Sequence, residues 1–102
     1  MSWITVCEFR ELAVGMPVAV MVDGDAICVV RAGDDVFAVH DECTHAAVPL
    51  SEGEVDGATI ECWMHGSTFD LRTGEALNLP ATAPVRTYPV RVHDGHVQVS
   101  RT

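Results

Sequence analysis

The sequence predicts an all-β protein, a small antiparallel β sandwich or barrel, to which two loops rich in Cys and His are attached. Short apolar or alternating segments are separated by turn-forming Gly, Asp and Pro along most of the chain. No stretch of useful length shows apolar residues at helical spacing, apart from one possible turn in residues 9–14, FRELAV. Because the chain has 102 residues, we expect a single domain over residues 1–102.

The first half of the chain contains three predicted strands. Residues 17–22 (PVAVMV) and 26–31 (AICVVR) flank the turn-rich tripeptide Asp-Gly-Asp at 23–25. A third segment, residues 36–40 (VFAVH), follows the short connection AGDD at 32–35. Connections of this kind join neighbouring antiparallel strands, so we expect three antiparallel strands here.

The second half alternates turns with short strands. We expect turn structure in residues 51–57 (SEGEVDG) and a short strand in residues 58–62 (ATIEC). Residues 67–71 (STFDL) form a further predicted strand, and residues 72–75 (RTGE) form another turn.

The C-terminal segment, residues 88–100, gives the clearest strand pattern. It contains Val90, Val92, Val97 and Val99 in alternation with Arg91, His93, His96 and Gln98. The dipeptide Asp94-Gly95 at its centre favours a two-residue hairpin turn. We expect a hairpin with one face in the core and the other in water. The preceding residues 78–85 (NLPATAPV) contain two prolines, which predicts an irregular and rather stiff loop.

The charge of the chain is strongly acidic. Six Arg, no Lys and fifteen Asp plus Glu give a formal net charge of −9, which makes nucleic acid an improbable partner. No basic residue lies between Arg31 and Arg72, and nine acidic residues do: Asp34, Asp35, Asp41, Glu42, Glu52, Glu54, Asp56, Glu61 and Asp70. This interval is either a solvated surface or an acidic face that steers a basic partner.

The sequence also predicts the cellular compartment of the protein. Hydrophobic residues form 48% of the chain but never run unbroken for the roughly 20 positions of a membrane span. The segment MSWITVCEFREL lacks the basic start and apolar run of a secretory signal. We therefore expect a cytoplasmic protein without a membrane partner, in which four Cys are ligands or free thiols rather than disulfides.

Two Cys/His pairs are the strongest functional signal. Cys43 and His45 form a C-x-H pair, and Cys62 and His65 form a C-x-x-H pair after sixteen intervening residues. Two thiolates and two imidazoles suit either one tetrahedral zinc ion or an iron-sulfur cluster. Zinc sites of this composition usually present C-x-x-C on one element, whereas each loop here has a mixed pair. Mixed pairs are what two facing loops would supply if the Cys held one iron of a 2Fe-2S cluster and the His held the other.

These spacings resemble those of the Rieske-type ferredoxins. Further similarity runs through LSEGEVDGATIEC (residues 50–62), HGSTFDLRTG (65–74) and LPATAPV (79–85), so it covers nearly the whole chain. Two positions depart from the common pattern, because Ala47 stands where Gly is frequent and Trp63 where Pro is frequent. The resemblance implies the Rieske fold and one 2Fe-2S cluster held by Cys43, His45, Cys62 and His65.

The resemblance also implies a function. High-potential relatives carry an extra disulfide at the positions of Val48 and Met64, so this chain is similar to the ferredoxin branch. Members of that branch pass single electrons from a flavin-dependent reductase to a terminal non-haem iron oxygenase. We therefore expect a monomeric electron carrier without a catalytic site of its own. A redox-sensing or accessory subunit of another oxidoreductase or of a cluster-assembly system is the alternative, and a structural zinc protein is a third.

Residues around the ligand pairs have secondary expectations. Trp63 and Met64 are expected to form a partly exposed apolar rim that excludes water and, with Pro80, docks a partner. Gly66 would let backbone N–H groups approach the cluster sulfurs. The resemblance implies that Ser67 can donate a hydrogen bond to the cluster, whereas the second donor of high-potential relatives is replaced by Phe69. The expected reduction potential is therefore low.

The remaining Cys and aromatic residues are expected to be structural. Cys7 and Cys28 lie in apolar strand contexts and are predicted to be buried or half-buried free thiols. Four aromatic residues are expected in the core or at its edge: Trp3, Phe9, Phe37 and Tyr88.

Overall fold

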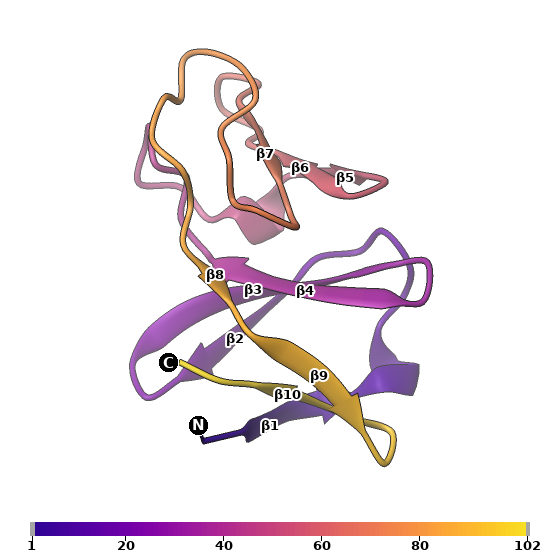
Figure 1. The fold of residues 1–102 in the computed structure, drawn as a ribbon. Coiled ribbons are helices and arrows are strands. Elements are labelled where there is room, and N and C mark those ends of the chain that lie inside the picture. The colour runs from indigo at the N-terminus through magenta and orange to yellow at the C-terminus, as the bar shows by residue number, and fades with distance from the viewer. Residues whose placement is uncertain (1, 102) are drawn as a thin grey trace.

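The computed structural model, which describes residues 2–101, is built from three antiparallel sheets (Figure 1). One sheet has the strand order β1-β10-β9, formed by Ile4–Glu8, His96–Val99 and Val90–His93. The second has the order β2-β3-β4-β8, formed by Val18–Val22, Asp25–Ala32, Asp35–His40 and Thr87–Tyr88. The third has the order β5-β6-β7, formed by Glu54–Asp56, Thr59–Glu61 and Thr68–Asp70.

The β2-β3-β4-β8 sheet is the middle layer, and the other two sheets cover its opposite faces (Figure 1). The four central residues of strand β3, residues 27–30, are apolar and buried on both faces of the sheet. Its Ile27 and Val29 belong to the core shared with the β1-β10-β9 sheet. Its Cys28 and Val30 belong to the core shared with the β5-β6-β7 sheet. The strands predicted in residues 17–40 are thus confirmed, and the run of buried apolar residues in β3 reflects its place in the middle layer.

Two Asp-Gly dipeptides close the hairpins as predicted. Asp94 and Gly95 have φ values of 50° and 77°, and Asp23 and Gly24 have φ values of 49° and 88°. Left-handed conformations at both central residues match the twist of the strands that a two-residue turn connects. Asp tolerates this conformation better than most residues and Gly tolerates it freely, which is why these dipeptides favour hairpins.

Two local expectations need correction. Residues 51–57, predicted as turn, contain the end of the short 3-10 helix η2 (Leu50–Glu52) and the strand β5. The hairpin at the C-terminus buries Val97 and Val99 of β10 as predicted, but Val92 is 45% exposed. Since β9 lies at the edge of its sheet, its outer residues lack the cover that β10 receives in the centre.

The rest of the architecture agrees with the prediction of an antiparallel all-β fold. The single helical turn expected in residues 9–14 is the 3-10 helix η1, Phe9–Glu11. Residues 78–85 have no regular structure and include a cis peptide bond between Leu79 and Pro80. No helix within residues 2–101 is long and apolar enough to cross a membrane.

Candidate functional site

The candidate site lies at the end of the molecule formed by the β5-β6-β7 sheet and three irregular segments (Figure 1). We call these the first loop (residues 41–51), the second loop (residues 62–67) and the proline loop (residues 77–86). The first loop connects β4 to η2, and the second loop connects β6 to β7. The proline loop leads from the β7 region back to β8 at the top of Figure 1.

The structure brings the four candidate ligands together as two pairs. Cys43 and Cys62 are 3% and 1% exposed, belong to the same core cluster and lie within hydrogen-bonding reach of each other. The rings of His45 and His65 are solvent-exposed and meet edge to face, with centroids 5.0 Å apart. The site therefore has an inner pair of sulfur atoms and an outer pair of imidazoles.

The surroundings of Cys62 act in opposite directions on the charge of its sulfur atom. Burial raises the pKa of the Cys62 thiol, and the neighbouring Cys43 raises it further. Two backbone groups, the N–H of Met64 and the N–H of His65, oppose this by donating hydrogen bonds to the Cys62 sulfur. Hydrogen bonds from backbone N–H stabilise a thiolate, whether it is free or bound to a metal ion.

This donor set fits a cluster with two metal ions. The candidate side chains meet sulfur with sulfur and imidazole with imidazole. A Rieske 2Fe-2S cluster requires that division, because two His replace two Cys on one of its two irons. The pairing and the backbone donors around Cys62 are compatible with that group.

Gly66 shapes the turn of the second loop. It has a φ of 76°, a conformation that Gly adopts at low cost, and its own N–H donates to the carbonyl oxygen of Cys62 at 3.1 Å. The N–H groups that reach the Cys62 sulfur belong to the two residues before it. Gly66 therefore closes the turn that aims those groups at the sulfur.

Hydrogen bonds, rather than regular secondary structure, fix the shape of the first loop. The Cys43 N–H donates to the Val48 carbonyl at 2.9 Å, inside the loop. The carboxylate of Asp41 accepts two bonds from Ser51, each 2.7 Å long, and so joins the two ends of the loop. The hydroxyl of Thr44 donates to the Ala83 carbonyl of the proline loop at 2.7 Å.

The second loop is tied to the proline loop by two side chains. Buried Ser67 accepts a hydrogen bond from the Ala81 N–H at 3.1 Å, which leaves its own hydroxyl hydrogen available to another acceptor. The amide of Asn78 accepts from the Thr68 N–H at 2.6 Å and donates to the Gly66 carbonyl at 3.2 Å. The sequence-based prediction missed Asn78, although a polar residue beside a proline loop is a recognisable candidate for such a bond.

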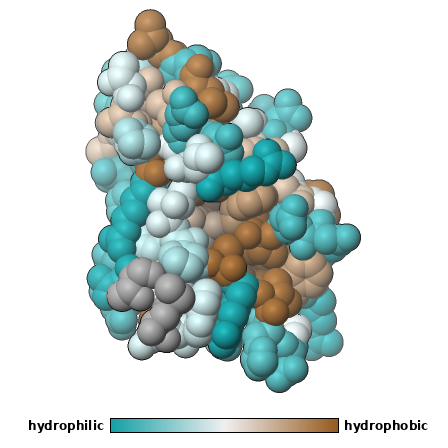
Figure 2. Space-filling model, viewed as in Figure 1, coloured by the Kyte–Doolittle hydropathy of each residue, from teal (hydrophilic) through white to brown (hydrophobic). Residues whose placement is uncertain are grey.

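Exposed apolar side chains lie on the second loop and on the proline loop, and we call them the apolar rim. Trp63 is 53% exposed and Met64 is 42% exposed, as the position between two ligands predicts. The proline loop adds Leu77 and Leu79, of which Leu79 is 76% exposed, whereas Pro80 is half-buried. Apolar side chains accordingly appear at the top of the molecule in Figure 2. The sequence-based prediction named Pro80 and missed Leu77 and Leu79, which are the more exposed apolar side chains of this loop.

Most of the acidic side chains between Arg31 and Arg72, the acidic interval, are exposed to solvent. Asp41 is only 7% exposed and is withdrawn into the base of the first loop. Asp70 is half-buried, and the other seven acidic residues of the interval are exposed. Glu42 and Glu61 directly precede the two candidate Cys ligands, so negative charge flanks the site.

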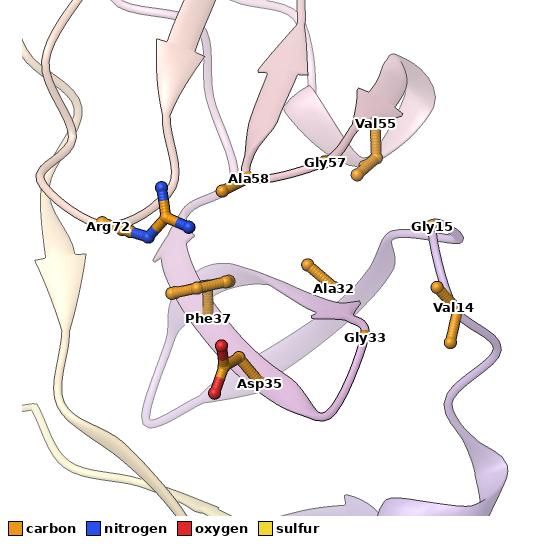
Figure 3. A pocket seen from close by; sticks show the side chains of 10 residues that line it. All are labelled: Val14, Gly15, Ala32, Gly33, Asp35, Phe37, Val55, Gly57, Ala58 and Arg72. Atoms are coloured by element: carbon orange, nitrogen blue, oxygen red, sulfur yellow. The ribbon is translucent and has the colours of Figure 1, made fainter.

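A separate hollow of about 230 Å³ lies between the middle sheet and the β5-β6 hairpin. Figure 3 shows Arg72 pointing from the turn after β7 toward Phe37 of β4, with Asp35 on the other side of that ring. None of the four candidate ligands lines this hollow. It lies at the junction of two layers rather than at the candidate site.

The other two cysteines are free thiols, as predicted. Cys28 is fully buried, and burial followed by the charge of Asp41 raises the pKa of its thiol well above the usual range. Cys7 is half-buried, and burial together with Glu11 raises the pKa of its thiol as well. High pKa values keep both groups protonated and poorly nucleophilic. The four aromatic residues also lie where predicted, since Tyr88 is buried and Trp3, Phe9 and Phe37 are half-buried.

Comparison with known proteins gives one consistent result. Residues 2–89 match the family described as the Rieske 2Fe-2S domain. The ferredoxin subunit of 3-phenylpropionate/cinnamic acid dioxygenase from Photorhabdus laumondii is 44% identical over 101 residues, which are 98% of this chain and 95% of that protein.

Solved structures agree with the sequence relatives. The ferredoxin of carbazole 1,9a-dioxygenase from Nocardioides aromaticivorans has a TM-score of 0.96 and 38% identity, with 100% of both chains covered. A complex of reduced oxygenase and oxidized ferredoxin in carbazole 1,9a-dioxygenase contains a chain with a TM-score of 0.92 and 37% identity, which covers 96% of this chain and 92% of that one.

Proposed function

Because the chain belongs to the Rieske 2Fe-2S domain family, we propose that Cys43 and Cys62 hold one iron of a 2Fe-2S cluster and that His45 and His65 hold the other. The observation that carries this proposal is the pairing of two buried sulfur atoms beneath two exposed imidazoles. When bound, such a cluster accepts and returns one electron. The protein is thus a one-electron carrier, the ferredoxin component of a multicomponent system rather than its catalyst.

The side chains around the site have separate tasks in electron transfer. Buried Cys43 and Cys62 would anchor the cluster against the core, and the backbone donors of the second loop would stabilise charge on sulfur. Exposed His45 and His65 would bring one edge of the cluster to the surface, where a partner can approach it. Hydrogen bonds within and between the surrounding loops would limit their rearrangement when an electron is gained.

The partners follow from the relatives. Proteins of similar sequence are ferredoxin subunits of dioxygenases, and a similar chain is present in a complex with an oxygenase. We propose that this carrier receives electrons from a flavin-dependent reductase and delivers them to a terminal non-haem iron oxygenase. Its docking face would be the apolar rim of Trp63, Met64 and the proline loop. The acidic residues beside this rim favour partners with a basic surface.

We further propose that the chain acts as one domain in the cytoplasm. Pairing of β10 with β1 and the shared core around strand β3 support a single folding unit. The free thiols of Cys7 and Cys28 suit a reducing compartment, in which disulfides are rare.

The ligand assignment predicts the iron content of cysteine variants. Cys43→Ser and Cys62→Ser should each lose the cluster, because Ser supplies no thiolate and the raised pKa values of Cys7 and Cys28 keep those thiols protonated. Cys7→Ser and Cys28→Ser are matched controls that should retain two irons per chain. Iron and acid-labile sulfide analysis of the four purified variants measures this directly. Two irons retained by Cys43→Ser would refute the ligand set.

The environment of the sulfur atoms predicts a low potential. Rieske centres span about −150 to +300 mV, and hydrogen bonds to sulfur raise the value because they stabilise the added electron. Ser67 can still donate, whereas fully buried Phe69 cannot. Voltammetry should place the wild type near the low end of the range, with Ser67→Ala lower and Phe69→Tyr higher by about tens of millivolts.

Phe37→Tyr is the control for this measurement, because it adds the same hydroxyl to a half-buried ring of the middle sheet, away from the loops. Its potential should equal that of the wild type. A wild-type potential well above zero would contradict the assignment to the ferredoxin branch.

If the acidic residues steer a basic partner toward the site, the rate of electron transfer should depend on ionic strength. Electron transfer from the reduced protein to cytochrome c, a basic one-electron acceptor, should slow several-fold as the Debye length shrinks to about 10 Å near 0.1 M salt. Stopped-flow absorbance gives the rate. Glu42→Gln and Glu61→Gln should slow the reaction at low salt, whereas the distant control Asp34→Asn should change it less. A rate independent of salt would assign the acidic residues to solubility alone.

A further inference from the structure

Asp41 is the one buried acidic residue between Arg31 and Arg72. The ligand assignment gives it no role. Its carboxylate is 7% exposed and accepts hydrogen bonds from both the N–H and the hydroxyl of Ser51, each 2.7 Å long. These two residues are the first and last of the loop that carries Cys43 and His45. This pair of hydrogen bonds, which we call the clamp, therefore closes the loop at its base.

Both ends of this closure are anchored to regular structure. The Asp41 N–H donates to the Ala26 carbonyl of β3 at 2.9 Å, which fixes one end to the middle sheet. At the other end Leu50 is fully buried, and its carbonyl accepts from the Gly53 N–H at 2.9 Å. Gly53 lies so close to β6 that a Cβ there would overlap the Glu61 carbonyl oxygen. Since Glu61 precedes Cys62, the clamp fixes the first loop relative to the second.

Within the described residues, no cationic side chain forms an ion pair with Asp41. In residues 2–101 the ion pairs of the Arg side chains are with Glu8, Asp34, Asp23 and Asp25. The Asp41 carboxylate is bound by neutral donors and is 7% exposed, and its charge adds to the burial that raises the pKa of the Cys28 thiol. A charge in a poorly solvated interior acts over a longer distance than one in water.

We propose that Asp41, with Ser51, is a positioning residue for electron transfer: the clamp holds Cys43 and His45 against the second loop, and the interior charge lowers the reduction potential of the cluster. This inference rests on the proposed function. The geometric part follows because irregular backbone keeps its shape only where its ends and polar groups are fixed. The electrostatic part follows because reduction adds negative charge to a site near a fixed anion.

Three variants separate the two contributions. Asp41→Asn removes the charge but keeps the shape, since its amide oxygen can accept from the Ser51 N–H and its amide nitrogen can donate to the Ser51 hydroxyl. Ser51→Ala keeps the charge and removes one of the two bonds. Asp41→Ala removes the charge and both bonds. Asp25→Asn is the matched control, because Asp25 accepts a 2.7 Å bond from Arg101 at the start of β3.

The measurements are the reduction potential, the EPR spectrum of the reduced protein, and the rate at which iron is released to a chelator. Asp41→Asn should shift the potential to a more positive value while iron release stays close to that of the wild type. Ser51→Ala should release iron about tenfold faster without a positive shift, because one charge-assisted bond is lost. Asp41→Ala should release iron faster still and change the EPR g values. Asp25→Asn should leave all three readouts unchanged.

Hydrogen exchange of the oxidised, cluster-loaded protein tests the clamp by a readout that does not depend on the reduction potential. The N–H of Cys43, which is bonded inside the first loop, should exchange faster in Ser51→Ala than in the wild type. The same change should be absent in Asp25→Asn.

Two results would overturn the inference. One is that Asp41→Asn and Ser51→Ala both match the wild type in reduction potential, EPR spectrum and rate of iron release. The other is an equal shift of potential in Asp41→Asn and Asp25→Asn, which would reflect net charge rather than position. Failure of the proposed function itself would look different, since the wild-type protein would then bind no 2Fe-2S cluster under any reconstitution condition.

Discussion

The closeness of the Cys43 and Cys62 sulfur atoms inside the core is the constraint on which the rest of the structure depends. Two sulfur atoms from separate loops can lie together only if both loops are fixed, and neither loop contains a strand or a helix beyond η2 at its end. Irregular backbone near a core must satisfy its polar groups by other means. Thr44 donates a hydrogen bond for that purpose, and Asp41, Ser67 and Asn78 accept hydrogen bonds from backbone N–H groups.

The three-layer architecture explains why such loops can be supported at one end of a small protein. The middle sheet has an apolar core on each face, so the β5-β6-β7 sheet can be anchored without contact with the β1-β10-β9 sheet. The core on the loop side includes the two candidate Cys ligands themselves. A bound cluster would therefore be continuous with the hydrophobic core on one side and with solvent on the other. This position suits a carrier that must protect its redox group and still expose an edge to partners.

The sequence predicted the fold class and the candidate ligands because both depend on local patterns. Strand alternation, Asp-Gly turns and two fixed Cys/His spacings are visible within a few residues. The short strand β5 was missed because residues 54–56 pair only across a tight turn, and polar residues dominate them. Asp41 was misjudged for a different reason: it has the same local context as its exposed acidic neighbours. Its burial and its bond to Ser51 arise only when the first loop closes, which no local pattern encodes.

The measurement that tests the central claim most directly is ENDOR spectroscopy of the reduced protein labelled with 15N-histidine, together with Mössbauer spectroscopy of 57Fe-labelled protein. The account predicts two inequivalent irons, one with sulfur ligands alone and one coupled to two imidazole nitrogens. The nitrogen couplings should disappear in a His45→Cys, His65→Cys double variant. Two equivalent irons, a single iron, or couplings to fewer than two imidazoles in the wild-type protein would contradict the division into an inner sulfur pair and an outer imidazole pair.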